Sequence, residues 1–136
     1  MLLTIEKVLI LKSVSLFAET PEEILADIAS ILEELTLQPG ESVFEKGDIG
    51  QEMYIIVDGR MRIHDGEKTI AFLRSRDVFG EMAALDPEAR SATVTAVEET
   101  HLFKLGHHVL YELMTEHVDV VRGIIRVLCQ RLRQMI

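Results

Sequence analysis

FGEMAALDPEARSATV, residues 79–94, decides how the rest of this chain is interpreted. Glu81 and Arg90, nine positions apart, flank a run of small and apolar residues and an Asp-Pro turn. Met82–Leu85 can form a single helical turn, and the first amides of such a turn attract an anion, phosphate above all. Gly80 permits a close approach of the backbone, and the planar guanidinium of Arg90 suits two phosphate oxygens. The stretch therefore predicts a site for a singly charged phosphodiester.

Glu81 needs a separate explanation, because a carboxylate next to a bound phosphate is repelled. It fits such a site if it accepts hydrogen bonds from a ligand hydroxyl while Arg90 compensates its charge. An anionic diester with a neighbouring hydroxyl describes a ribose cyclic phosphate. The spacing alone leaves open the alternative that Glu81 and Arg90 form an ion pair that fixes a loop.

The bulk composition predicts one soluble domain with an aliphatic core. The chain has 136 residues with 14 basic and 23 acidic side chains, a net charge of −9. This charge argues against direct nucleic-acid binding and against an anionic membrane surface. The lone Cys129 forms no internal disulfide, and no apolar run reaches the ~18 residues of a membrane span. We expect a cytoplasmic protein without membrane insertion.

Helices are predicted before residue 35. Residues 2–14 are apolar with scattered charges, and TPEEILADIASILEEL has stronger start signals. Thr20 is placed to cap, Pro21 takes the first helical position, and Glu23 completes a capping box. The apolar stripe of this helix would be Ile24, Ile28, Ile31 and Leu35.

From residue 35 to 105 the pattern changes to short apolar segments separated by turn signals, which is typical of a β sandwich or barrel. Strands are expected at 92–97 and 100–105, and the total is about eight. The turn signals are Pro39-Gly40, Gly47-Asp48, Asp58-Gly59 and Asp65-Gly66. The predicted organisation is a single domain, 1–136, mainly β with flanking helices. It has helices in 1–34, a barrel in 35–105 that contains residues 79–91, and helices in 107–136.

The last helix, from Val118 to the end, carries two apolar stripes. One is a coiled-coil seam through which we expect a homodimer. It comprises Val118, Val121, Ile125, Leu128, Leu132 and Met135, of which the first five carry the predicted dimer contact. The other stripe, expected to pack on the β region, comprises Val120, Ile124, Val127 and Arg131.

Residues 79–94 resemble the phosphate-binding cassette of cyclic nucleotide-binding domains. The resemblance lies in Gly80-Glu81-x-Ala83, the short apolar turn, and Arg90-Ser91-Ala92-Thr93-Val94. Such domains occur in protein kinase regulatory subunits, cyclic-nucleotide-gated channels and the bacterial catabolite activator protein. PGESVFEKGD (39–48) and EMYIIVDGRMRI (52–63) resemble the family's glycine-punctuated strands. The resemblance covers essentially the whole chain and implies an eight-stranded jelly-roll barrel with N-terminal helices and a long C-terminal helix.

The family pattern implies a role for each matching residue. Glu81 would bind the ribose 2′-hydroxyl, Arg90 the cyclic phosphate, and Arg131 would lie near the nucleotide. The apolar wall against the purine would be Ile63, Ala71 and Leu73, which are equally compatible with ordinary barrel core. The full predicted set is Gly80, Glu81, Met82, Ala83, Arg90, Ser91, Ala92, Ile63, Ala71, Leu73 and Arg131, with Leu132 and Met135 as candidates to cover the base.

Two departures from the bacterial activator stand out. Where its final helix carries a Thr-Ser pair that contacts adenine, this chain has Met135-Ile136, which indicates an apolar lid and leaves base selectivity open. We expect cyclic AMP (cAMP) rather than cyclic GMP (cGMP) as the ligand. Ser91 does not decide between them, because a hydroxyl after the arginine occurs in family members that prefer either base. Three residues follow Arg133, too few for a DNA-reading helix-turn-helix, and the apolar end suggests a module of a longer polypeptide with an unknown effector.

The predicted function is a regulatory sensor whose C-terminal helix moves when a cyclic nucleotide binds, with no catalytic residue, cofactor or metal. One alternative is a ligand-free interaction or dimerisation domain. A more distant one is a cupin-like metal enzyme. For the latter, His64 and His101 occur singly, and His107 and His108 are expected to point apart on a helix, so no metal-ligand spacing emerges.

Overall fold

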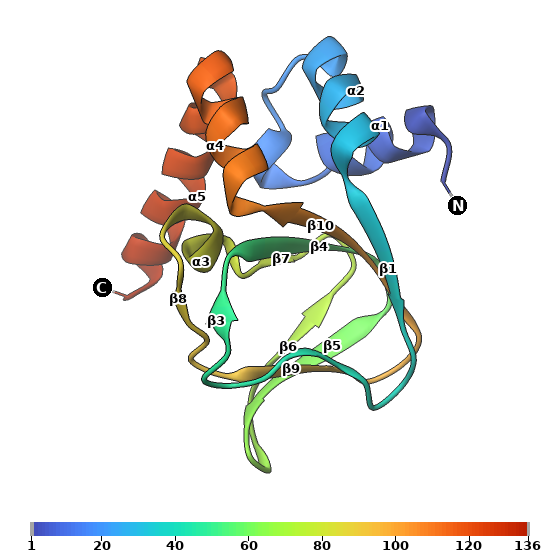
Figure 1. The fold of residues 1–136 in the computed structure, drawn as a ribbon, viewed down its shortest axis with the longest axis vertical. Coiled ribbons are helices and arrows are strands. Elements are labelled where there is room, and N and C mark those ends of the chain that lie inside the picture. Colours follow the sequence, from blue (N-terminus) through green and yellow to red (C-terminus); the bar gives the residue numbers. More distant parts are fainter. Residues whose placement is uncertain (1, 136) are drawn as a thin grey trace. The chain divides into compact units, whose positions relative to one another are not determined.

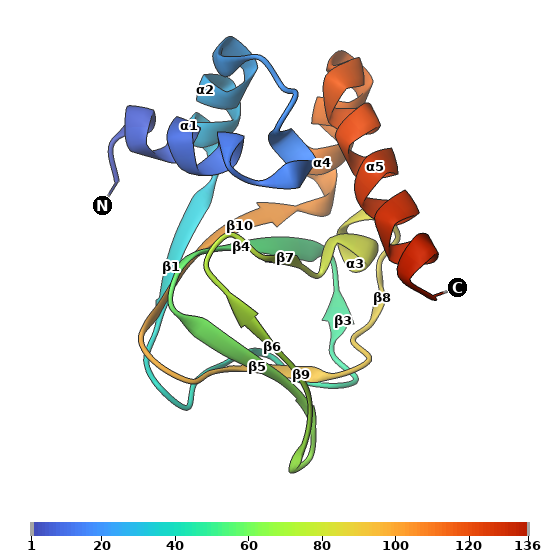
Figure 2. The same cartoon turned by 180° about the vertical axis from the view of Figure 1, so that it is seen from behind.

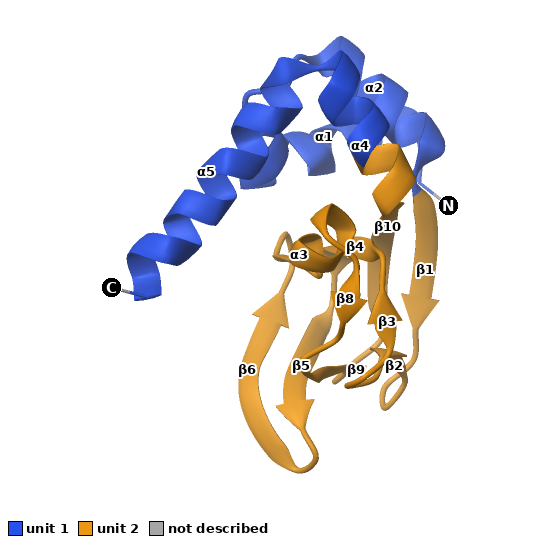
Figure 3. Ribbon diagram, turned by 60° about the vertical axis from the view of Figure 1, so that its left-hand side comes forward, with its two compact units in different colours: residues 1–32, 111–136 blue, residues 33–110 orange. Residues whose placement is uncertain are grey.

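The computed structural model describes residues 2–135, so Ile136 of the Met135-Ile136 pair lies outside the described residues. The chain divides into two compact units, shown in different colours in Figure 3. The barrel unit is residues 33–110. The helical unit combines residues up to 32 with those from 111 onward.

The barrel unit is built from short antiparallel strands, shown from two sides in Figures 1 and 2. Its strands are β1 (Glu33–Leu37), β2 (Ser42–Phe44), β3 (Ile49–Gly50), β4 (Glu52–Asp58), β5 (Arg60–Asp65), β6 (Lys68–Arg74), β7 (Val78–Phe79), β8 (Glu88–Ala89), β9 (Thr93–Ala96) and β10 (Thr100–Gly106). The predicted count of eight was wrong. Ten strands are present. The prediction was too low because β3, β7 and β8 have two residues each, which is too short for an alternation of apolar residues to reveal them.

Two four-stranded sheets and one two-stranded sheet make up this unit. Their orders are β1-β10-β4-β7, β2-β9-β5-β6 and β3-β8. Both larger sheets contribute inward-facing side chains to one core, which comprises Tyr54, Ile56, Met61, Phe79, Val94, Ala96 and Leu102. The strands predicted at 92–97 and 100–105 are confirmed as β9 and β10.

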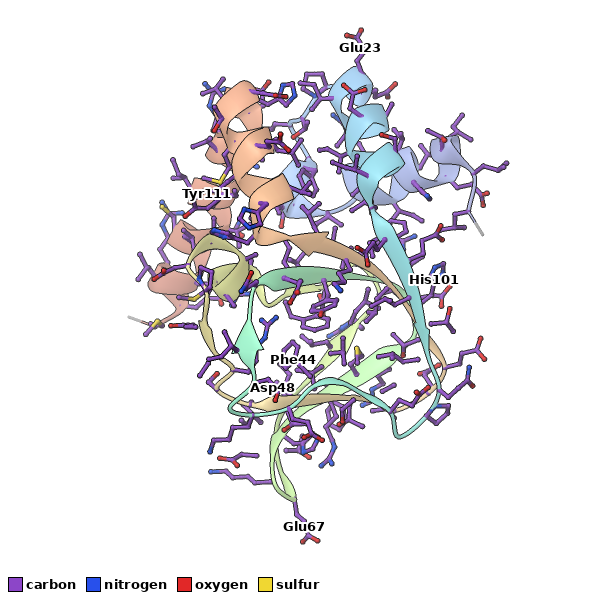
Figure 4. All side chains as sticks on the ribbon, in the orientation of Figure 1. Glu23, Phe44, Asp48, Glu67, His101 and Tyr111 are labelled. Atoms are coloured by element: carbon purple, nitrogen blue, oxygen red, sulfur yellow. The ribbon has the colours of Figure 1, made fainter. Side chains whose placement is uncertain are left out.

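The turn between β4 and β5 shows why its glycine was a reliable signal. Gly59 has φ +112°, and a Cβ there would lie 2.7 Å from the Cα of Thr100. Only glycine avoids both the strain and the overlap. The β5–β6 hairpin turns at Gly66 (φ +60°), as its Asp-Gly pair predicted, and Figure 4 shows Glu67 at its tip.

The helical unit begins with α1 (Thr4–Lys12), the 3₁₀ turn η1 (Ser15–Phe17) and α2 (Glu22–Ile31). The predicted capping box at Thr20 was wrong. The cap position of α2 is Pro21, whose carbonyl accepts the amides of Ile24 and Leu25, both at 3.0 Å. Thr20 is one residue too early, and its buried hydroxyl has no hydrogen-bond partner among residues 2–135.

The apolar stripe of α2 also differs from the prediction. Ile28 is buried, but Ile31 is 48% exposed and Leu35 belongs to β1. Leu25 and Leu32 occupy the buried side instead, because the helix ends at Ile31 and the chain turns into the strand.

The helical unit ends with most of α4 (His107–Glu116) and with α5 (Val118–Met135), and both helices are confirmed. The inner side of α5 packs on η1. Val120 and Ile124 are buried, and a Cβ on Gly123 would collide with the carbonyl of Leu16. The exposed seam residues are Val118, Ile125, Leu132 and Met135. No helix in residues 2–135 is long and apolar enough to cross a membrane.

Candidate functional site

The cassette, residues 79–91, contains the helical turn that its sequence predicted. α3 spans Glu81–Leu85 and is entered through Gly80, whose φ of +78° lies in the left-handed region that favours glycine. The amide of Ala84 donates to the Gly80 carbonyl at 3.2 Å. The amides of Met82 and Ala83 belong to the first turn, where no preceding helical carbonyl reaches them.

Charge and small side chains lie together in this turn. Glu81 is 5% exposed, and Ala83 and Ala84 are also buried. Met82 points outward and is 54% exposed, so only its main chain remains available to a ligand on the inner side. Burying a carboxylate costs free energy unless the group is paired or hydrogen-bonded. The burial of Glu81 therefore singles it out as a candidate functional residue.

The main chain of Arg90 is fixed from both directions. Its amide donates to the Asp48 carbonyl at 2.7 Å, and its carbonyl accepts the Gly47 amide at 2.9 Å. The adjoining β3–β8 pair joins Ile49 to Ala89 and continues this ladder. The turn predicted at Gly47-Asp48 therefore positions the arginine of a segment more than forty residues later.

The guanidinium of Arg90 is buried, and the side chain is 5% exposed. Nη2 donates to the Glu52 carbonyl at 2.8 Å and lies 3.7 Å from the Glu52 carboxylate. Its carboxylate partner is thus Glu52, and the ion pair with Glu81 that the spacing left open is not formed by Arg90. Nε has no hydrogen-bond acceptor among residues 2–135.

Two glycines make room for this guanidinium. A Cβ on Gly50 would overlap Nε and Cζ of Arg90, and a Cβ on Gly80 would lie 2.9 Å from Nη1. The structure thereby brings Arg90 next to the entry of α3. Sequence reasoning missed Gly50, since nothing local to its position signals a contact with Arg90.

One ring of an aromatic cluster packs on the guanidinium. Cζ of Arg90 lies 4.0 Å from the ring centroid of Phe44, a cation–π geometry. The ring centroid of Phe44 also lies 6.0 Å from the ring centroids of both Tyr54 and Phe79. Figure 4 shows Phe44 projecting inside the ring of strands. Burial, and then the nearby Glu52 carboxylate, raise the pKa of Tyr54 above its ordinary value.

The predicted apolar wall lies on the inner face of the β5–β6 hairpin. Ile63 is directly opposite Ala71, and Leu73 is opposite the fully buried Met61. Ile63 and Leu73 are half-buried and pack against the barrel core, whereas Ala71 is exposed. Ser91, the last residue of the cassette, is exposed, and Ala92, which follows it, is 8% exposed.

The other predicted contacts belong to the helical unit. Arg131, Leu132 and Met135 lie in the last turns of α5 and are exposed. Their proximity to the nucleotide remains a prediction.

The cassette has a hydrogen-bonded connection to the start of α4. Nδ1 of His107 lies 2.5 Å from the carbonyl of Ala84, near the end of α3. The His107 amide donates to the Gln51 carbonyl at 2.7 Å. The expectation that His107 and His108 point apart was wrong, because their rings meet edge to face at 5.4 Å. No group of three or more His, Cys, Asp and Glu in residues 2–135 is arranged to hold a metal.

Comparison with known proteins identifies this architecture. A family profile described as cyclic nucleotide-binding domain matches residues 34–117, a range that contains the entire cassette. The chain belongs to the cyclic nucleotide-binding domain family. The resemblance seen in the sequence is thus confirmed.

Individual relatives agree with the family assignment. The cyclic AMP receptor protein of Thermus thermophilus is 36% identical over 120 residues, which are 84% of this chain and 55% of the relative. The crystal structure of Thermus thermophilus catabolite activator protein matches with a TM-score of 0.81 at 32% identity, over 89% of this chain and 59% of that one. The regulatory domain of Toxoplasma gondii PKA, co-crystallised with cAMP, matches with a TM-score of 0.71 at 28% identity, over 80% of this chain and 43% of that one.

These likenesses confirm the predicted jelly-roll fold with its long C-terminal helix. The chain spans little more than half the length of the Thermus receptor protein. The common part is the nucleotide-binding domain.

Proposed function

We propose that this domain is a cAMP sensor in which Arg90 receives the cyclic phosphate. The observation that carries the proposal is a buried guanidinium with unused donors. Arginine has five N–H groups, and Arg90 directs Nη2 to Glu52 while Nε has no acceptor in residues 2–135. Buried donors without partners are costly. A singly charged phosphodiester supplies both the missing acceptors and a compensating charge.

The remaining groups of the cassette complement a ribose ring. The amides of Met82 and Ala83 lie in the first turn of α3, where they can donate to a phosphate oxygen. Glu81, buried two residues away from Ala83, is a hydrogen-bond acceptor for the 2′-hydroxyl. The short side chain of Ala83 leaves the ligand room to approach.

We assign the base as adenine. The Thermus relative is named for cyclic AMP and the Toxoplasma structure contains cAMP. In this chain the wall of Ile63, Ala71 and Leu73 provides apolar contact, and Leu132 and Met135 are the candidates that cover the base from α5. Such contacts select for shape rather than for hydrogen-bonding groups, so we expect moderate preference for cAMP over cGMP.

The signal passes through α4 to α5 in this proposal. His107, the first residue of α4, is hydrogen-bonded to the Ala84 carbonyl near the end of α3, and α4 continues into the helical unit. A ligand that tightens the cassette shifts the position of the Ala84 carbonyl, to which His107 is hydrogen-bonded. The start of α4 moves with it, and α5, which carries Arg131, moves in turn. The nucleotide shifts this equilibrium by its difference in affinity for the two states.

The exposed seam of α5 is the proposed homodimer contact. Val118 is 66% exposed, Ile125 55% and Leu132 60%. Large apolar side chains repeated along one helix face are typical of an interface. Sedimentation equilibrium should show a dimer that Ile125→Glu converts to a monomer. A monomeric wild type would contradict the proposed dimer while leaving the nucleotide site untouched.

Calorimetric titration with cAMP, cGMP and 5′-AMP tests the sensor proposal. We expect micromolar or tighter binding of cAMP, weaker binding of cGMP, and at least about tenfold weaker binding of 5′-AMP. The open phosphate of 5′-AMP brings a second negative charge for which the cassette has no further cation. Absence of binding to both cyclic nucleotides would favour the alternative of a ligand-free interaction domain. Equal affinity for 5′-AMP would contradict the assigned phosphate site.

A further inference from the structure

We propose that the outer side of the β5–β6 hairpin binds an acidic, extended segment of a partner protein, which adds as a strand to the open edge of β6. The surface is called the arginine face below and comprises Arg60, Arg62, Phe72 and Arg74. It lies on the opposite side of the hairpin from the proposed purine wall, and the proposal does not depend on nucleotide binding.

Cross-strand register brings the arginines together. Arg60 is directly opposite Arg74, and Arg62 is directly opposite Phe72. Because side chains alternate with a period of two, all four project from the same side of the hairpin. Like charges directly opposite each other destabilise a sheet. The pairing of Arg60 with Arg74 is therefore unfavourable for the isolated domain.

Within the part of the chain that the structure describes, no carboxylate relieves this repulsion. Arg60 lies over the ring of Phe72 at 4.2 Å, and Nη1 of Arg62 bonds the hydroxyl of Thr69 at 3.0 Å. Among residues 2–135, Arg60, Arg62 and Arg74 form no ion pair. This is notable in a chain with 23 acidic residues.

The edge of β6 is open as well as cationic. β6 is last in the order β2-β9-β5-β6 and, within residues 2–135, pairs only with β5, and Figure 3 shows it at the margin of the barrel unit. Ile70 is 56% exposed and Phe72 49%. An exposed edge strand with apolar side chains is a template for strand addition, in which main-chain bonds give affinity and side chains give specificity. Charges on an edge can also serve only to prevent self-association, and the experiment below separates the two roles.

The charge distribution favours an acidic peptide over a nucleic acid or a membrane. Charges on the protein surface are screened beyond about 8 Å at physiological salt. A single added strand contacts little more than the arginine face. A nucleic acid or an anionic membrane extends across the rest of a chain with net charge −9, and the repulsion there opposes binding.

The test is a titration of the isotope-labelled full chain, monitored by amide NMR. The probe is a blocked heptapeptide of alternating Glu and Val, and the control peptide has Gln at every Glu position. We expect the Glu peptide to shift the amides of residues 69–73 and to slow their hydrogen exchange. Binding should weaken with added salt. The Gln peptide should bind at least about tenfold more weakly, because charge-assisted contacts are lost.

Paired variants locate the site. Arg62→Gln/Arg74→Gln should reduce affinity for the Glu peptide about tenfold or more, whereas Arg122→Gln/Arg133→Gln on α5, matched in charge change, should leave it unchanged. Thermal melting of both variants verifies the fold, and removal of the repulsion at Arg74 should not lower the melting temperature.

Four results would overturn the proposal. These are no amide shifts with the Glu peptide, equal binding of both peptides, tighter binding of oligothymidylate or phosphatidylserine vesicles to the same residues, and shifts that come only from self-association in a sedimentation experiment.

Discussion

The barrel unit uses arginine in two opposite ways. Arg90 is buried, its main chain is bonded on both sides, and its guanidinium is held by Phe44 and Glu52. Arg60 and Arg74 are exposed, lie directly opposite each other on β5 and β6, and have no carboxylate partner among residues 2–135. The electrostatic interaction of a charge is strong where water is excluded and weak where water screens it.

This difference indicates what each site can bind. A buried cation that is fixed by several neighbours suits a small anion that enters the protein, and its removal should have a large effect. Exposed cations suit an extended partner through several weak, salt-sensitive contacts.

The largest effect among the supporting residues is expected at Gly80. Gly80→Ala places a Cβ at a φ of +78° and 2.9 Å from the Glu52 carbonyl and from Arg90. The left-handed conformation alone should cost about 1–2 kcal/mol of the free energy of unfolding, and displacement of the cassette should also abolish tight nucleotide binding. Urea denaturation and calorimetry measure the two effects.

Gly40→Ala is the matched control for that variant. Gly40 has φ +89° but open space around its Cβ position. It should lose stability through backbone strain alone and retain nucleotide affinity. If Gly80→Ala and Gly40→Ala behave alike, the crowding around Arg90 has no importance.

A more selective change is Gly50→Ala. The new Cβ would overlap Nε and Cζ of Arg90, and a flexible side chain moves more readily than the backbone. We expect cAMP affinity to fall about tenfold, ~1.4 kcal/mol, with a melting temperature close to that of the wild type. Unchanged affinity would show that the observed position of the guanidinium is not the one that binds phosphate.

Tyr54 tests the burial of the same region through pH. Because burial raises its pKa above 10.0, the folded state retains the phenol proton more tightly than the unfolded state. The resulting stability is fully present below pH 10 and is lost as the pH rises above it, since the unfolded chain then gains by ionising. Tyr54→Phe should flatten this alkaline decline in urea denaturation, whereas Tyr111→Phe, at a 45% exposed site, should not. An identical alkaline decline in the free energy of unfolding of both variants would contradict the assigned contribution of Tyr54.

The smallest effect is expected on the outer face. Arg74→Gln removes the like charge opposite Arg60 and should raise the free energy of unfolding by ~0.2–1 kcal/mol at low salt, less at high salt. Urea denaturation at two salt concentrations measures it. A loss of stability would mean that Arg74 has a favourable interaction in the folded domain. That result would contradict the unrelieved repulsion between Arg60 and Arg74.

The sequence predicted those parts of the site that are local. Gly80, Glu81 and Arg90 lie within one short motif, from which the glycine at the entry and the helical turn were predicted, whereas the burial of both charges was not. Glu52 and Phe44 were missed, because each reaches Arg90 only through the pairing of distant strands.

The errors in the fold have equally local causes. Thr20 carries the chemistry of a cap, but the helix begins after Pro21, and a shift of one residue removes the capping bond. β3 and β8 are held by backbone bonds around Asp48 and Arg90 rather than by apolar alternation. Two-residue strands of this kind leave no pattern in the sequence.

Calorimetric titration of cAMP into Arg90→Ala and Arg74→Ala, side by side with the wild type, tests the central claim most directly. We expect Arg90→Ala to lose ~2–5 kcal/mol of binding free energy, because the phosphate would be buried without its charged partner. Arg74→Ala should bind cAMP as the wild type does. Unchanged affinity in Arg90→Ala, or equal losses in both variants, would contradict the assignment of Arg90 as the phosphate receptor.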